Sequence, residues 1–182
     1  MDVIIEHAKE KDALELSKII MSISSKVYSN TFPEDNFDFS EQDINNLEVV
    51  IRNRIRHGYI YIIAIINGKI VGCINWEIIL KDSKQYGKLN DFYILEDYQR
   101  KGIGSKLFEE VCKELSQKNI NNMIVITIKG THSIEFYKKY NYKQLNVVNY
   151  KIRNLIVKAY EIIYEDITHI ERREKDGEPG YI

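Results

Sequence analysis

The sequence predicts a single domain of the α/β (α+β) class, in which strands and helices are mixed along the chain. Residues 88–115 carry this prediction first, because an alternating, aromatic strand pattern up to Ile94 gives way at Ile103 to the apolar spacing of one helix face. The second observation is the pair Asn67-Gly68 between two β-rich runs, which is the strongest short-range signal for a hairpin. A length of 182 residues with 44% hydrophobic residues is enough for one real core.

The N-terminal third is predicted to contain one short strand and two helices. Residues 3–5 form the strand, and Asp12 with Glu15 three residues later marks the start of the first helix. Residues 28–40 then break all periodicity. The second helix begins at Ser40, with Asp43 at the position of a capping box, and stops at Gly58. The apolar face of the first helix consists of Leu16, Ile19, Ile20, Ile23 and Val27, and that of the second of Ile44, Leu47, Ile51 and Ile55.

The remainder of the chain is predicted to be mostly strands. Residues 59–66 and 70–80 form the hairpin arms, and 88–94 form the next strand, before the helix that begins at Ile103. Residues 123–128 are almost entirely apolar, as in a strand covered on both faces. The pattern then gives a short helix over 133–140 that ends at Asn141, and closing strands over 142–152 and 155–165 that turn at Arg153-Asn154. Every residue from 171 to 180 is charged, Gly or Pro, so we expect one domain over 1–166 and a charged C-terminal tail over 167–182.

The junction between the strand and the helix of residues 88–115 has the features of a phosphate-binding turn. It consists of Gln99-Arg100-Lys101-Gly102-Ile103-Gly104, with two glycines at the start of the helix. A helix start has about four N–H groups without internal partners and a partial positive charge, and glycines let phosphate oxygens reach those groups. A P-loop is excluded because no segment has its pattern. A dinucleotide-binding fingerprint is excluded because Leu107 stands at the third glycine position.

The motif Q-R-K-G-I-G after an aromatic strand resembles the acetyl-CoA-binding motif of the GNAT acetyltransferases, Q/R-x-x-G-x-G/A. The segment 9–13 resembles the start of the first helix in that family, and 134–142 resembles its second motif, in which an F-Y pair precedes G-F or G-Y. Two positions depart from the pattern: Asn141 stands where Gly is usual, and Gly130 where the family often has Asn. The resemblance covers about residues 3–166. It implies a mixed, mostly antiparallel central sheet with helices on both faces.

The resemblance also implies acetyl-CoA as co-substrate and the residues that hold it. The diphosphate would sit on the N–H groups of residues 100–105, and the pantetheine arm would run along the preceding strand like an added strand. A backbone N–H near Ile94 would face the thioester oxygen. Lys101 and Lys106 would add charge from the rim, or would be ordinary solvent-exposed lysines. The cofactor-binding residues implied are Phe92, Tyr93, Ile94, Gln99, Arg100, Lys101, Gly102, Ile103, Gly104, Ser105 and Tyr137.

Catalysis requires one group to take a proton from the amine and another to protonate the departing thiolate. By its place in the F-Y pair, Tyr137 is implied as the general acid, although thirteen tyrosines in the chain make a core tyrosine an alternative. Glu77 and Asp91 are the carboxylates nearest the expected site. Each is equally compatible with a solvated strand residue, and of the two we prefer Glu77.

The acceptor is predicted to be a cationic primary amine, either a small molecule such as a polyamine or aminoglycoside, or a lysine side chain. Residues 32–43, which would wall the acceptor site, contain five carboxylates, three Phe and no Lys or Arg. A solvated acidic loop explains the same composition. The alternatives are an N-terminal α-amine acetyltransferase and a non-catalytic acyl-CoA-binding sensor or interaction module.

Composition sets the remaining expectations. A net charge of −1 and a pI of about 6.4 give no reason to expect nucleic acid as a partner. Cys73 and Cys112 stand far apart in apolar patterns, so no metal site or disulfide framework is expected and a cytoplasmic location fits best. No apolar run reaches membrane-spanning length and the N-terminus is too charged for a signal peptide, so no membrane association is expected. A homodimer is common among proteins that resemble this one.

Overall fold

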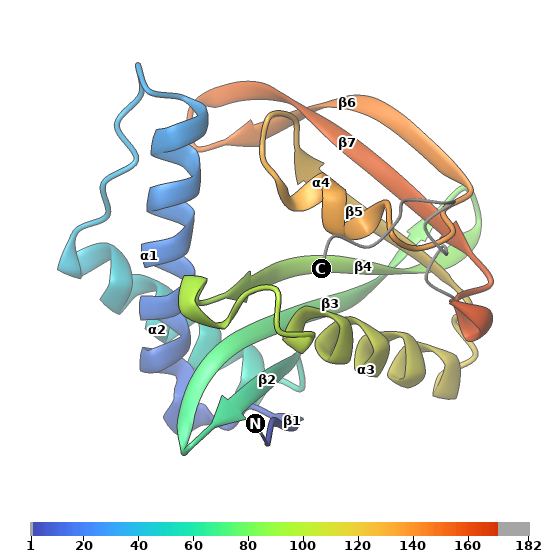
Figure 1. Ribbon diagram of the computed structural model, residues 1–182, viewed down its shortest axis with the longest axis horizontal. Coiled ribbons are helices and arrows are strands. Elements are labelled where there is room, and N and C mark those ends of the chain that lie inside the picture. The colour runs from blue at the N-terminus through green and yellow to red at the C-terminus, as the bar shows by residue number, and fades with distance from the viewer. Residues whose placement is uncertain (1, 171–182) are drawn as a thin grey trace, which may run out of the picture.

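The computed structural model describes residues 2–170 and shows one mixed sheet with helices on both faces (Figure 1). Within that range seven strands pair in the order β1-β2-β3-β4-β5-β7-β6, and β4 with β5 is the one parallel pair among them. This confirms the predicted fold class. The strands are β1 (Ile4–His7), β2 (Ile60–Ile66), β3 (Lys69–Lys81), β4 (Lys84–Ile94), β5 (Asn122–Ile128), β6 (Gln144–Ile152) and β7 (Leu155–Glu165). The helices are α1 (Ala13–Thr31), α2 (Glu41–Arg56), α3 (Ile103–Gln117) and α4 (Ser133–Tyr137).

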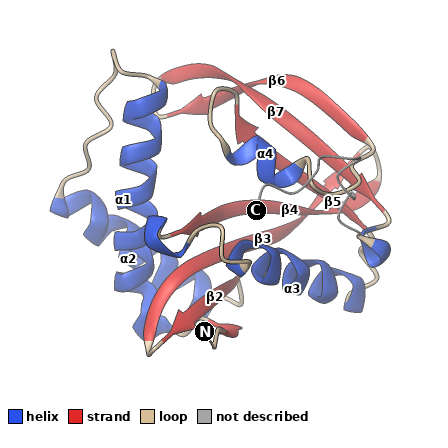
Figure 2. Cartoon of the chain, in the orientation of Figure 1, coloured by secondary structure: helices blue, strands red, loops and turns tan. Residues whose placement is uncertain are grey.

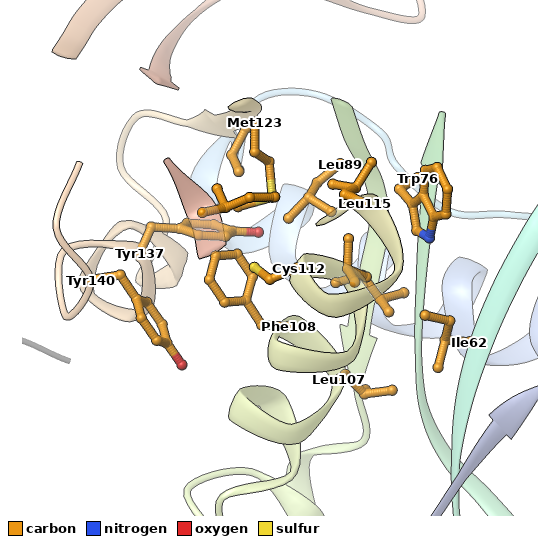
Figure 3. Close-up of a cluster of buried hydrophobic side chains, with 14 of the residues drawn as sticks. Ile62, Trp76, Leu89, Leu107, Phe108, Cys112, Leu115, Met123, Tyr137 and Tyr140 are labelled. Atoms are coloured by element: carbon orange, nitrogen blue, oxygen red, sulfur yellow. The ribbon is translucent and has the colours of Figure 1, made fainter. Parts of the chain in front are cut away.

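The two faces of the sheet bury different helices. Alternate residues of β2 separate the layers: Ile62 packs in the cluster that includes α3 and α4, whereas Ile63 packs in the cluster that includes α1 and α2. Figure 1 shows α1 and α2 packed together and α3 lying next to β2 and β3, and Figure 2 shows the same elements coloured by type. Figure 3 shows the α3 side of the core, where Leu107, Phe108 and Leu115 meet side chains of the sheet.

The first helix begins where the sequence predicts, but for a different reason. Asp12 is its N-cap, yet its side chain makes no cap hydrogen bond to the helix; Asp12 Oδ2 instead accepts from the backbone N–H of Lys9 at 2.7 Å. The helix also runs on to Thr31, so the expected break after Val27 was placed too early. The second helix follows its prediction, because Ser40 and Asp43 form the reciprocal capping box.

Two tight hairpins join β2, β3 and β4. The turn at Asn67-Gly68 has positive φ at both residues, 49° and 76°, which is the conformation that favours Asn-Gly and confirms the predicted hairpin. The second turn, at Asp82-Ser83, also has two positive φ values, 51° and 63°. It was not predicted, and consequently β4 begins at Lys84, four residues before the predicted strand.

The C-terminal part follows the predicted order with two shorter elements, α4 and β6, of which β6 begins at Gln144, two residues later than predicted. The helix α4 ends at Tyr137 rather than continuing to residue 140, and β7 has the predicted bounds. After Asp166, a 3-10 turn buries Ile167, whose N–H bonds to the carbonyl of Asn121 at 2.9 Å. The charged segment 171–180 lies outside the described residues, so the predicted tail stays a prediction.

Candidate active site

The strands β4 and β5 pair over a short stretch and then part (Figure 1). Their ladder joins Gly87–Leu89 to Met123–Val125, three residues on each strand. Beyond it, β4 continues along β3 as far as Ile94, while β5 continues along β7 as far as Ile128. Beyond this ladder, the facing edges of β4 and β5 form no main-chain hydrogen bonds with each other. An extended ligand can lie there and form main-chain hydrogen bonds with the exposed edge.

The backbone of Ile94 faces this open edge. The N–H of Leu95 bonds to the carbonyl of Val71 in β3 at 2.9 Å, and consecutive residues of a strand direct their N–H groups to opposite sides. The N–H of Ile94 consequently points away from β3. Its carbonyl accepts a hydrogen bond of 2.9 Å from Nε2 of Gln99, which ties the turn after β4 to the end of that strand.

The helix α3 starts at this turn without a side-chain cap. Its N-cap is Gly102, with φ 79°, a conformation that favours glycine, and Arg100 two residues earlier also has a positive φ of 56°. A Cβ added at Gly102 would meet no atom within 4 Å, so space outside the helix start is open. The first N–H groups of α3 are thus available to an anionic ligand.

Gly104 has a different structural role. A Cβ built there would lie 3.1 Å from Cδ1 of Ile94 and 3.3 Å from Cε2 of Phe136, closer than most real Cβ contacts. The absence of a side chain therefore lets the first turn of α3 pack against β4 and α4. Of the two glycines, Gly102 supplies the backbone conformation and Gly104 supplies the close approach.

Tyr137 lies at the end of α4, buried among aromatic rings on the α3 side of the sheet (Figure 3). Its ring centroid is 6.3 Å from those of both Phe92 and Phe108. The hydroxyl of Tyr164 donates to the carbonyl of Tyr137 at 2.9 Å, which fixes the backbone there. Burial raises the pKa of Tyr137 well above its ordinary value, so its hydroxyl keeps its proton at neutral pH.

A β-bulge in β4 turns two consecutive residues to the opposite face of the sheet. Trp76 pairs with Leu89 and Ile74 with Phe92, so Asn75 alone faces both Asn90 and Asp91. Leu89 and Phe92 both pack on the α3 side. The two residues between them line a pocket on the side of α2.

This pocket has a volume of about 290 Å³ and walls from α2, β3, β4 and β6. Both carboxylates singled out in the sequence, Glu77 and Asp91, line it. Glu77 is paired with Lys88 at 3.3 Å, and the side chains of this pair are 34% and 32% exposed. The complete lining is Arg54, Tyr59, Asn75, Glu77, Lys88, Asn90, Asp91 and Tyr150. A wider hollow of about 530 Å³ lies at the other end of α3, beside Lys113 and Ile167.

Asp91 is held in the pocket by a chain of hydrogen bonds. Tyr61 donates to Oδ2 of Asp91 at 3.4 Å, and Nη1 of Arg54 donates to the hydroxyl of Tyr61 at 3.2 Å. Burial raises the pKa of Asp91, against the opposing effects of Arg54 and of the Tyr61 hydrogen bond. Burial together with the nearby Asp91 charge raises the pKa of Tyr61 to about 12, so Tyr61 stays a donor.

The acidic segment between α1 and α2 already holds a cation from the same chain. Arg153, in the turn between β6 and β7, lies over the ring of Phe39 at 4.3 Å and near that of Phe37 at 5.9 Å. Its guanidinium also donates to the carbonyl of Asn36 at 3.2 Å. Two of the three Phe rings expected to attract a cationic substrate are thus in contact with Arg153.

The structure brings most predicted site residues to one place on the sheet. Residues 92–94 form the open end of β4 and residues 99–105 form the turn and helix start beside it, while Glu77 and Asp91 share the pocket on the other face. The ammonium of Lys101 lies 5.6 Å from the ring of Tyr98. Sequence reasoning missed Arg54 and Tyr61, which are distant in sequence and carry no motif.

Across residues 2–170, no three His, Cys, Asp or Glu side chains gather closely enough to hold a metal ion. None of the helices in that range combines the length and the apolar character needed to cross a bilayer.

Comparison with known proteins agrees with this geometry. The acetyltransferase (GNAT) family model matches residues 18–142. An uncharacterised N-acetyltransferase of Bacillus subtilis (strain 168), YuaI, is 23% identical over 170 residues, which cover 93% of this chain and 96% of that protein. Two solved structures have a similar fold at 17% identity. PaiA N-acetyltransferase from Thermoplasma acidophilum, in complex with coenzyme A, has a TM-score of 0.67 and covers 91% of this chain and 99% of its own. Ribosomal-protein-alanine N-acetyltransferase from Brucella melitensis has a TM-score of 0.65 and covers 89% and 99%.

The family model spans well over half of the chain and includes the glycine turn, the open end of β4 and the F-Y pair. The chain therefore belongs to the GNAT family of acetyl-CoA-dependent N-acetyltransferases.

Proposed function

We propose that this protein transfers the acetyl group of acetyl-CoA to a primary amine that binds in the pocket beside Asp91. The observation that carries the proposal is the open edge of β4. It lies next to the start of α3 and Tyr137 on one face of the sheet, and next to the pocket of Asp91 on the other. Two substrates that approach from opposite faces would meet at this edge.

The residues at the edge fit acetyl-CoA, which supplies an acetyl thioester when bound. The N–H groups of residues 100–105 would hold the diphosphate, since Gly102 leaves the space outside the helix start open. The N–H of Ile94, on the open side of β4, would donate to the pantetheine arm or to the thioester oxygen. A donor placed where negative charge develops is among the strongest contributions to catalysis.

We favour Asp91 over Glu77 as the base that accepts a proton from the amine. An alkylamine with a pKa near 10.4 is neutral at pH 7 in only about one molecule in 2,500, a handicap of roughly 4–5 kcal/mol. Burial raises the pKa of Asp91, which makes its carboxylate the stronger proton acceptor, whereas Glu77 is paired with Lys88. This choice reverses the preference for Glu77 that the sequence alone supported.

Tyr137 would protonate the departing thiolate. As the bond between nitrogen and the acetyl carbon forms, the carbon–sulfur bond breaks and its electron pair goes to sulfur. An N–H proton of the attacking neutral amine would pass to Asp91, and the hydroxyl proton of Tyr137 would pass to the sulfur. Proton exchange with solvent would then return Asp91 to its carboxylate and Tyr137 to its hydroxyl before the next turnover. Because burial raises the pKa of Tyr137, this hydroxyl is protonated when it is needed.

The test is release of free thiol from acetyl-CoA by the purified protein with a panel of amines, with the acetylated product confirmed by mass spectrometry. The panel includes polyamines, aminoglycosides, lysine peptides, peptide N-termini and free amino acids. Peptides with a free α-amine form the second candidate class, because one structural neighbour is named as a ribosomal-protein-alanine N-acetyltransferase. Binding of acetyl-CoA without thiol release for any amine would support a silent binding module and contradict the proposal.

A further inference from the structure

We propose that the acceptor is a small zwitterion, an amine with a carboxylate one or two carbons away. Its ammonium would lie against Asp91 and its carboxylate would bind Arg54. The inference rests on the proposed function and specifies its substrate class. It departs from the cationic amine, such as a polyamine, an aminoglycoside or a lysine side chain, expected from the acidic segment 32–43.

The charges of the pocket support this class. Lys88 and Glu77 form an ion pair with each other and so largely neutralise themselves. Arg54 and Asp91 form no direct ion pair, because the hydroxyl of Tyr61 lies between them. One cation and one anion, held apart by a single hydroxyl group, therefore face the same small pocket. A ligand with the opposite arrangement of charges, ammonium beside carboxylate, complements both.

Arg54 is placed to bind an anion from outside the chain. Its neighbours on α2 are both engaged: Arg52 pairs with Glu48, and Arg56 pairs with Glu10 at 2.6 Å. No carboxylate of the described residues lies within ion-pair distance of Arg54, and its hydrogen bond to Tyr61 uses one of five N–H donors. A guanidinium with spare donors at a pocket wall matches a carboxylate, which it can bind through two hydrogen bonds.

The size and lining of the pocket exclude a long or strongly cationic acceptor. A volume of about 290 Å³ is at the small end of ligand pockets. No aliphatic side chain lines it, so a polar ligand fits it better than an apolar one. The wall contains as many cations as carboxylates, Arg54 and Lys88 against Glu77 and Asp91, so it offers no net attraction to a polyamine or an aminoglycoside. In addition, two of the three Phe rings of segment 32–43 that were expected to hold such a cation are in contact with Arg153.

The experiment compares matched acceptors that differ in one group. The twenty common amino acids and β-alanine are assayed beside their carboxamides, with acetyl-CoA, by thiol release and mass spectrometry. The amine of an amino-acid amide is less basic than that of the acid, so more of it is neutral and able to react at neutral pH. Reactivity alone therefore favours the amide, and a preference for the acid reports binding of its carboxylate. We expect the wild-type protein to prefer at least one acid over its amide by about 10- to 100-fold in kcat/KM, as for a hydrogen bond to a charged group.

The variant Arg54→Gln should remove this preference. It should raise the KM of the acid about 10-fold or more relative to that of the amide, beyond any loss that both substrates share through Tyr61 and Asp91. Arg56→Gln, on the same helix and paired with Glu10, is the matched control and should change neither substrate.

Three results would overturn the inference. Equal losses on acid and amide in Arg54→Gln would mean that Arg54 acts through Tyr61 and Asp91 instead of binding a carboxylate. Turnover of amides, peptides or polyamines in preference to every acid would leave the proposed function intact and reject the zwitterion. Failure of every amine to support thiol release would reject both the zwitterion and the proposed function.

Discussion

The side-chain amide of Gln99 donates a hydrogen bond of 2.9 Å to the carbonyl of Ile94, so the turn that precedes α3 is tied to the open end of β4. The two parts of the proposed acetyl-CoA site, the N–H groups of the helix start and the edge of the strand, are held in one geometry by this contact. Without it, Ile94 and Gln99 would be connected by the four residues between them, which include the 3-10 turn at Glu96–Tyr98.

Replacing Gln99 by Ala should therefore weaken acetyl-CoA binding more than it slows chemistry. Loss of one hydrogen bond of about 0.5–1.5 kcal/mol corresponds to a rise in KM for acetyl-CoA of about 2- to 10-fold, with a smaller change in kcat. Steady-state kinetics at saturating amine measure both. Gln85→Ala, on an exposed part of β4, is the control and should have neither effect. A KM equal to that of the wild type would show that the contact does not position the cofactor.

The helix start can be tested by a pair of glycine substitutions with the same strain. Gly102→Ala and Gly68→Ala both place a Cβ at a positive φ, 79° and 76°, with no atom within 4 Å. Each should lower the free energy of unfolding by about 1–2 kcal/mol. Gly102→Ala alone should also raise KM for acetyl-CoA, because its methyl group occupies the space that the diphosphate would take. Denaturant unfolding and kinetics on both variants separate the two effects, and equal KM values would argue against the phosphate site.

Tyr137→Phe should lower kcat about 100-fold or more, with a smaller effect on KM for acetyl-CoA, because it removes the proton donor and keeps the ring in its aromatic cluster. Tyr86→Phe, in β4 near the second hairpin, removes a hydroxyl outside the proposed site and serves as control. An unchanged kcat in Tyr137→Phe would remove this residue from the mechanism.

Asp91→Asn should lower kcat/KM by about 100-fold or more and at the same time stabilise the fold at neutral pH. Because burial raises the pKa of Asp91 above its unfolded value near 3.9, the folded state binds its proton more tightly. The Asp91 carboxylate therefore costs stability as pH rises above about 4, and the Asn side chain does not. The difference in Tm between the variant and the wild type should grow from pH 4 to pH 7.

The matched control for that experiment is Glu77→Gln. This carboxylate is partly exposed and paired with Lys88, so its loss should reduce kcat/KM less than the Asp91 substitution does. If Glu77→Gln had the larger effect on activity, the assignment of the base would be wrong.

Local chemistry made much of the fold predictable. Asn67-Gly68 adopts the two positive φ values that define its hairpin, and Ser40 forms its capping box with Asp43, so both elements were placed within a residue or two. The hairpin at Asp82-Ser83 was missed because neither residue is a glycine, although both adopt positive φ. The end of α1 was missed because residues 28–31 continue the helix without an apolar pattern that would show it.

The candidate site was predictable where it follows a motif and not where it depends on contacts across the fold. The turn with Gly102 and the F-Y pair with Tyr137 lie in continuous segments that the sequence displays. Arg54, Tyr61 and Asp91 come from α2, β2 and β4, and their hydrogen-bonded chain exists because the tertiary fold brings this helix and these two strands together. Arg153 reaches Phe39 from more than a hundred residues away, so no local pattern could show that this ring is occupied.

The extra residue in β4 makes the length of that strand as important as its composition. Leu89 and Phe92 both belong to the apolar layer under α3, although three positions separate them, and the two polar residues between them share the opposite face. A strand shortened by one residue here would return to strict alternation. Either Asp91 would then be driven among the rings around Phe108, or Phe92 and Ile94 would be turned out of that layer. Variation among relatives that keep this chemistry should accordingly change side chains in this stretch and spare its residue count.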